Sequence, residues 1–340
     1  MSYTSFPMKG MSASIENLPK LSVILPVYNA EATLERTLES IKASSETSLE
    51  IICVNDGSKD ASGDILRKIA QNDARFVVIE QENQGVSAAR NVALQECTGK
   101  YVIFVDADDE VRPDYFANLL QEADSHAADL VVCGFSVCLE NGTVQESRYA
   151  ARVYDTLTPD VLTSLPVGVC SHLYRRHILA TENGILTFPV GVRYGEDTAF
   201  HYAVFPKITK LVISAECGYI IHETEGSATD RGSQLISDMP TVLEWLNSLY
   251  KIHNMKGMEY LVLYAKHTMQ RMYSLASCAV IKTNLRALQN AMLKCDIRGE
   301  DMDCLPKKYQ KRLKSILLGC CRPPFSFYIK RLKNIRKLFA

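Results

Sequence analysis

The fold is decided by the stretch Leu21–Asn29, LSVILPVYN, in which an apolar run ends in a polar pair. Two similar runs follow, LEIICV at Leu49–Val54 and YVIFV at Tyr101–Val105. Between the first two lies Ala30–Ala43, whose apolar residues have helical spacing. Continuous apolar strands that alternate with helices are typical of a parallel sheet covered on both faces. The sequence therefore predicts an α/β fold with a doubly wound, mostly parallel sheet.

The rest of the chain divides into segments of different character. We expect an N-terminal extension over 1–19, the α/β half over 20–134, a less regular stretch over 135–230, and a helical C-terminal region over 231–340. Further strands are expected at 76–79 and 128–133, and further helices at 61–72, 85–96, 113–123 and near 198–205.

The composition excludes several classes of protein. Of the 340 residues, 47% are hydrophobic and 23% are charged, which is globular and not disordered or fibrous. No apolar run reaches the roughly 18–20 residues of a membrane span, and no secretory signal is evident at the N-terminus. The 11 cysteines form no C-x-x-C pair, which favours reduced thiols in the cytoplasm over disulfides or zinc sites.

Charge is distributed unevenly along the chain. The segment Leu305–Ala340 has 11 basic residues and no acidic one, which leaves 27 basic against 39 acidic residues elsewhere. Its last part also sets apolar residues at helical spacing, namely Phe325, Tyr328, Ile329, Leu332, Ile335 and Phe339. This pattern is typical of an amphipathic helix on an anionic membrane, but it also fits the wet face of packed terminal helices. Nucleic acid is not expected as a partner, because the body is acidic and has no recognition motif.

Polar clusters follow three of the expected strands, at Tyr28-Asn29, Asn55–Ser58 and Asp106–Asp109. In an open α/β sheet such clusters meet at the carboxyl ends of the strands, where ligands bind. No glycine-rich nucleotide loop is present, so phosphates would need a divalent cation held by the carboxylates, Mg²⁺ or Mn²⁺. The aspartates could also be a solvated turn. A haloacid-dehalogenase motif is disfavoured, because that motif normally ends the first strand and places Thr or Val where Glu110 stands.

Five pieces of the chain together resemble a family 2 glycosyltransferase with the GT-A nucleotide-sugar fold. They occur in the family's order between Ser22 and about Thr229: VILPVYNAEATLERTLESI, IICVNDGSKD, QENQGVSAARN, GKYVIFVDADDEVRPD and GVRYGEDTAFHY. The resemblance implies that 20–134 binds the nucleotide sugar and that 135–230 forms the acceptor side of the catalytic domain.

The resemblance also implies roles for single residues of the donor site. Pro26, Tyr28 and Asn29 fall where family members hold the base and ribose, and Asp56 falls where a carboxylate accepts a hydrogen bond from the base, usually uracil. Three further residues would line the sugar-phosphate side: Asn83, Gly85 and Arg90.

The acidic residues would divide the chemistry between them. Asp106 and Asp108 form the D-x-D element, in which the first carboxylate usually faces the ribose and the second ligates the metal. Asp197, preceded by Glu196, occupies the position of the catalytic base. A carboxylate base suits this chemistry, because the acceptor hydroxyl must lose its proton as it attacks.

The resemblance, with the residues that match it, implies an inverting enzyme that moves a sugar, from a UDP-sugar, to a glycan or lipid-linked saccharide of a bacterial surface polymer. It would work in the cytoplasm, at the inner face of the membrane if the basic tail binds there. Ser171-His172 and Tyr219–His222 depart from common family patterns on the acceptor side, so acceptor identity is not inherited. The alternative is an inactive carbohydrate- or membrane-binding module. Sugar-nucleotide synthesis is disfavoured, since its glycine-rich basic N-terminal loop is absent.

Overall fold

The computed structural model describes residues 18–158, 161, 165–166, 168–182, 184–192, 195–223, 238–255, 258–275, 278–305 and 307–318. Two compact units divide the chain. The first comprises 1–191 with 207–225, and the second comprises 192–206 with 226–340.

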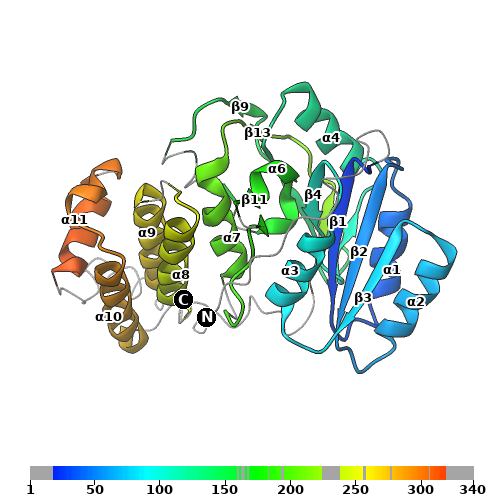
Figure 1. Ribbon diagram of the computed structural model, residues 1–340, viewed down its shortest axis with the longest axis horizontal. Helices are drawn as coiled ribbons and strands as arrows, with labels where there is room; N and C mark the ends of the chain where they lie inside the picture. The colour runs from blue at the N-terminus through cyan, green and yellow to red at the C-terminus, as the bar shows by residue number, and fades with distance from the viewer. Residues whose placement is uncertain are drawn as a thin grey trace. The chain divides into compact units, whose positions relative to one another are not determined.

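The first unit is built on an eight-stranded mixed sheet (Figure 1). In spatial order its strands are β3 (Phe76–Gln81), β2 (Leu49–Asp56), β1 (Leu21–Val27), β4 (Tyr101–Phe104), β10 (His172–Arg175), β6 (Leu130–Val132), β13 (Leu211–Ile213) and β9 (Arg152–Tyr154). The first four strands are parallel. Every residue of β1 is buried, as expected for a central strand covered on both faces.

Four helices cover this sheet in the described part of the unit. They are α1 (Leu34–Lys42), α2 (Ser62–Asn72), α3 (Val86–Glu96) and α4 (Tyr115–Ser125). Figure 1 shows α3 on one face of the parallel half and α1 and α2 on the other. That arrangement follows from right-handed crossovers, because the chain adds β2 and β3 on one side of β1 and then β4 on the other. The predicted doubly wound architecture is confirmed.

The order of the strands departs from a simple α/β repeat beyond β4. The predicted strand at 128–133 forms as β6, but β10 lies between it and β4 and is antiparallel to both. Val102 of β4 therefore pairs with Tyr174. The side chains of β10 at His172–Tyr174 are buried, so the insertion is part of the core.

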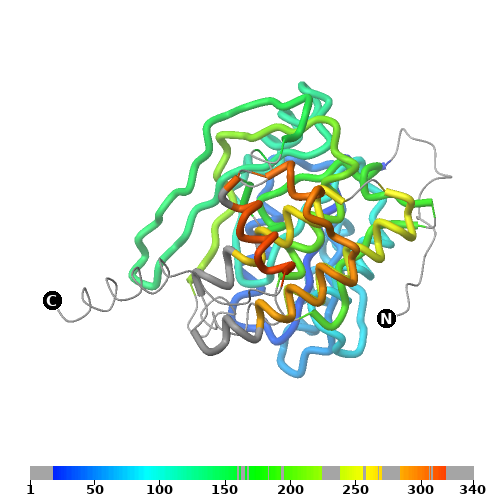
Figure 2. Tube along the Cα trace, turned by 90° about the vertical axis from the view of Figure 1, so that its left-hand side faces the viewer, coloured from blue at the N-terminus to red at the C-terminus, as the bar shows by residue number. Residues whose placement is uncertain are grey.

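A second, four-stranded sheet in this unit contains β5 (Glu110–Val111), β14 (Tyr219–His222), β7 (Phe135–Cys138) and β8 (Val144–Ser147). The β7–β8 hairpin projects outward, as the blue-green arm of Figure 2 shows. Because β14 pairs with β5, Tyr219 lies opposite Val111, directly after the Asp106–Asp109 cluster. Other short elements described in this unit are α6 (Arg176–Leu179), β11 (Ala180–Thr181) and β12 (Gly184–Ile185).

The second unit is helical. Its α-helices are α7 (Glu196–Val204), α8 (Met239–Ile252), α9 (Met258–Leu275), α10 (Cys278–Lys294) and α11 (Lys307–Leu317). In Figure 2, α10 and α11 lie side by side. The expected helix near 198–205 and the helical C-terminal region are thus confirmed. Within the ranges given above, no helix is long and apolar enough to cross a bilayer. The amphipathic pattern at 325–339 lies outside the described residues.

Candidate active site

The carboxyl ends of β1, β2 and β4 define the site. The chain runs outward from β1 through β2 to β3 and then returns to place β4 on the opposite side of β1. The strand order thus reverses between β1 and β4, which is where open α/β sheets bind ligands. All three polar clusters found in the sequence follow these strand ends.

Hydrogen bonds join the segment after β1 to the segment after β2. The Asn29 N–H donates to Ser58 Oγ (3.0 Å), and the Lys59 N–H donates to Asn29 Oδ1 (2.8 Å). Asn29 has a φ of 48°, a conformation that Asn tolerates better than most residues. Pro26 is buried in β1, whereas Tyr28 is 53% exposed. An aromatic ring left open at this edge suits stacking on a nucleotide base.

Asp56, at the end of β2, is buried and organises the segment that precedes α3. One carboxylate oxygen accepts from Gln81 Nε2 (2.6 Å) and the Gln84 N–H (2.9 Å), and the other accepts from the Gly85 N–H (2.8 Å). Asn83 Nδ2 donates to the Asp56 carbonyl (3.0 Å). Asp56 is only 2% exposed. Its hydrogen bonds hold Asn83 and Gly85 at the site. Its predicted bond to the base stays a prediction.

Asp106 is held through both carboxylate oxygens. Arg90 Nη2 donates to Oδ1 (3.0 Å) and Cys170 Sγ donates to Oδ2 (3.3 Å). Arg90 is 3% exposed, and its guanidinium lies 5.3 Å from the centre of the Phe188 ring. The Phe188 backbone is in turn clamped by Asn91, which donates to its carbonyl (3.0 Å) and accepts from its N–H (2.6 Å). These contacts fix the orientation of the first D-x-D carboxylate.

Asp108 stands two residues further on and is half-buried. Burial, and then the neighbouring charge of Asp106, raises the pKa of Asp108. Burial and the same charge raise the pKa of Asp109 to about 8. Ionising several carboxyl groups on this turn therefore costs free energy, and a bound cation would lower that cost.

The donor set fits a hard divalent cation that substrate phosphates help to bind. Among the described residues, no group of three or more His, Cys, Asp or Glu side chains could hold a metal ion. Mg²⁺ commonly binds one or two carboxylates and completes its shell with water and phosphate oxygens. Asp108, with Asp106 beside it, would supply such a partial site.

Asp197 and Glu196 lie in the second unit, in the first turn of α7. Gly195 precedes them with a φ of 86°, a left-handed conformation that glycine adopts readily. Both acidic side chains are half-buried. The role of Asp197 as the base stays a prediction.

Comparison with known proteins identifies the family. A model described as glycosyl transferase family 2 matches residues 22–181. The uncharacterized glycosyltransferase EpsJ of Bacillus subtilis (strain 168) is 30% identical over 339 residues, covering 92% of this chain and 95% of EpsJ. The poly(ribitol-phosphate) beta-glucosyltransferase of Bacillus spizizenii is 29% identical over 204 residues, covering 59% of this chain and 32% of that protein.

The fold has a counterpart among solved structures. Residues 1–349 of S. aureus TarS, crystallised in complex with UDP, match with a TM-score of 0.67 and 17% identity, covering 88% of this chain and 87% of that one. The fold is therefore GT-A. The chain belongs to the family 2 glycosyltransferases and is an enzyme of that class.

Several side chains at the site were not found from the sequence. Cys170 and Phe188 touch Asp106 and Arg90 from parts of the chain remote in sequence. Tyr219 was singled out only as a departure from the family pattern. The sequence shows Asp109 only as the third aspartate of the cluster. The structure adds that it is buried, whereas a solvated turn would leave it exposed.

Proposed function

We propose that this enzyme transfers a sugar from a UDP-sugar, with inversion, to a hydroxyl of a glycan or lipid-linked saccharide in bacterial surface polysaccharide synthesis. One observation carries the proposal. The exposed Tyr28 and the Asp106–Asp108 turn follow the carboxyl ends of two adjacent strands, β1 and β4. TarS has been solved with UDP and with UDP-GlcNAc, which supports a UDP-sugar donor. The relative that acts on poly(ribitol-phosphate) supports a surface-polymer acceptor.

The residues would divide a single displacement between them. The acceptor oxygen attacks the anomeric carbon while the bond from that carbon to the diphosphate oxygen breaks. Asp197 takes the proton that the acceptor hydroxyl loses, and UDP leaves with the bonding electrons. Tyr28 stacks on the base, Pro26 and Asn29 shape the ribose side, and Arg90, Asn83 and Gly85 face the sugar-phosphate. These donor contacts are predicted from the family pattern.

A divalent cation, Mn²⁺ or Mg²⁺, would neutralise the charge that grows on the leaving diphosphate. Asp108 would ligate it directly. Asp106 would face the ribose or complete the ligand set, in the orientation that its hydrogen bonds with Arg90 and Cys170 give it.

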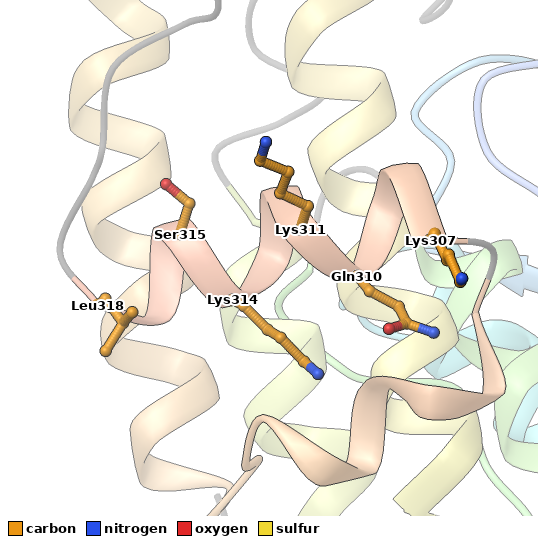
Figure 3. Close-up of a pocket in the computed structure, with 6 residues that line it drawn as sticks. All are labelled: Lys307, Gln310, Lys311, Lys314, Ser315 and Leu318. Carbon is orange, nitrogen blue, oxygen red and sulfur yellow. The ribbon is translucent and has the colours of Figure 1, made fainter.

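An anionic membrane surface is the second partner we propose, reached through α11. Lys307, Lys311 and Lys314 recur at helical spacing and line a surface hollow of about 510 Å³ (Figure 3). On the same helix, Leu313 and Ile316 are fully buried. The apolar side of α11 is thus occupied within its own unit, and its lysines would meet lipid headgroups electrostatically. The enzyme would then work at the inner face of the cell membrane.

A donor screen tests the proposed chemistry. The protein is incubated with a panel of nucleotide sugars in Mn²⁺, and release of each nucleoside diphosphate is measured. We expect hydrolysis of one or more UDP-sugars, and none after chelation by EDTA. Hydrolysis of GDP- or dTDP-sugars alone would contradict the UDP assignment, and equal rates with and without EDTA would contradict the metal.

A further inference from the structure

The turn that carries the D-x-D aspartates is held by a buried tyrosine. Tyr219, in β14, is 1% exposed, and its hydroxyl makes two hydrogen bonds at the turn. It accepts from the Asp106 N–H (3.1 Å) and donates to Asp109 Oδ2 (2.6 Å). A single hydroxyl group therefore joins the first residue of the Asp106–Asp109 turn to the last.

Asp109 itself faces inward. Its second oxygen accepts from the His222 N–H (3.1 Å), and its own N–H donates to the Asp106 carbonyl (3.2 Å). The side chain is 6% exposed. Both carboxylate oxygens of Asp109 thus accept hydrogen bonds from within the protein. We therefore assign Asp109 a structural role, in contrast to the ligand role proposed for Asp108.

Helix α1 holds the middle of the turn from another element. Thr33 Oγ1 and Thr37 Oγ1 donate to the Ala107 carbonyl at 2.9 and 3.0 Å. Arg36 Nη2 donates to the Asp108 carbonyl (2.6 Å). The backbone on both sides of Asp108 is therefore fixed by side chains before any donor arrives.

We infer that Tyr219, acting through Asp109, is a positioning residue that sets the Asp106 and Asp108 carboxylates for the cation and the diphosphate. The inference rests on the donor site proposed above. Groups that are fixed before binding need no ordering when the ligand arrives, so a preorganised turn binds more tightly than a loose one. Loss of the Tyr219 hydroxyl would leave the Asp106 N–H and an Asp109 oxygen buried without that partner.

The test compares Tyr219→Phe with Tyr101→Phe. Tyr101 is also 1% exposed and also donates to a carboxylate, that of Asp124 (2.8 Å), but it lies at the opposite end of β4. For each variant, UDP affinity is measured by calorimetry over a series of Mn²⁺ concentrations. We expect Tyr219→Phe to need about tenfold more Mn²⁺ for half-maximal UDP binding. Tyr101→Phe should match the wild type.

The readout separates positioning from general stability. A merely structural role would lower the melting temperature and the fraction of active protein, and it would leave the Mn²⁺ requirement unchanged. Asp109→Asn provides a second variant, which keeps the size of the side chain and one oxygen. We expect it to raise the Mn²⁺ requirement too, and we expect the double variant to show less than the product of the two single effects.

The outcomes distinguish this inference from the proposed function. If wild type binds UDP in Mn²⁺ and both Tyr219→Phe and Asp109→Asn share its Mn²⁺ requirement, only the positioning role is overturned. If wild type shows no Mn²⁺-dependent UDP binding, the proposed function and the inference both fall.

Discussion

Asp106 and Asp108 stand on the same turn, yet the protein treats their carboxylates differently. Arg90 and Cys170 bond to both oxygens of Asp106, whereas for Asp108 it is the backbone carbonyl that Arg36 fixes. The backbone of Asp108 is held in place, and the pKa of its carboxyl group is raised. A bound cation would stabilise the ionised form of this carboxyl group, as expected of a metal ligand.

Replacing the second carboxylate should therefore remove metal-dependent binding. We expect Asp108→Ala to abolish the Mn²⁺-dependent part of UDP binding, measured by calorimetry, while circular dichroism remains that of the wild type. Asp114→Ala is the control, because Asp114 is an exposed carboxylate a few residues away, before α4. UDP affinity in Mn²⁺ that Asp108→Ala leaves undiminished would argue against the role of Asp108.

The proposed base can be tested without changing its size. Asp197→Asn keeps hydrogen bonding but cannot accept the proton of the acceptor. We expect kcat for sugar transfer to fall by about 10²–10⁴, the usual contribution of general base catalysis, with UDP-sugar binding unchanged. Glu196→Gln, one residue before, is the matched control and should stay near wild type. The reverse result would assign the base to Glu196.

At the scale of elements, the turn after β2 depends on close backbone contact. Gly57 has a φ of 71°, and a Cβ on it would lie 2.8 Å from the backbone nitrogen of Asn83. An alanine there would be strained by its conformation and would also push on the segment that Asp56 holds.

We expect Gly57→Ala to lower the free energy of unfolding by about 1–3 kcal/mol from the clash, in addition to the conformational strain of about 1–2 kcal/mol. UDP affinity should fall too. Gly142→Ala isolates the conformational part, because Gly142 has a φ of 78° and nothing lies within 4 Å of an added Cβ. Urea unfolding measures both, and equal losses for the two variants would contradict a clash at Asn83.

Sequence patterns predicted the elements better than their pairing. The apolar runs at 21–27, 49–54 and 101–105 became β1, β2 and β4, because a buried strand must be apolar along its whole length. The insertion of β10 beside β4 was not predicted, since pairing between distant strands leaves no local period. The polar clusters could be found because each directly follows an apolar run. Tyr219 and Cys170 could not, because they contact Asp106 from distant parts of the sequence.

At the scale of the whole molecule, the basic surface of α11 predicts salt-dependent membrane binding. We expect sedimentation with vesicles rich in phosphatidylserine at low salt, and release at high salt, because each lysine near an anionic surface contributes about 1 kcal/mol that salt screens. The triple change of Lys307, Lys311 and Lys314 to Glu should reduce binding strongly, with donor hydrolysis intact.

The matched control changes three exposed lysines of the first unit, Lys20, Lys42 and Lys68, to Glu and so alters the net charge equally. Its binding should weaken far less. Removal of 319–340 spares Leu313 and Ile316 of the buried core, so it measures the share of the final segment. If the wild-type protein does not sediment with anionic vesicles at low salt, the lysines of α11 are only a solvated surface and the membrane proposal is wrong.

The place of β10 in the sheet has a consequence for how the chain is made. Strand β4 leaves the ribosome long before β10, and until residue 172 is synthesised one edge of β4 has no neighbour. At roughly 5–20 residues per second the nascent sheet spends seconds with an open, apolar edge. Such edges recruit strands from other chains. Nascent protein truncated between β4 and β10 should therefore be the form most dependent on chaperones in the cell.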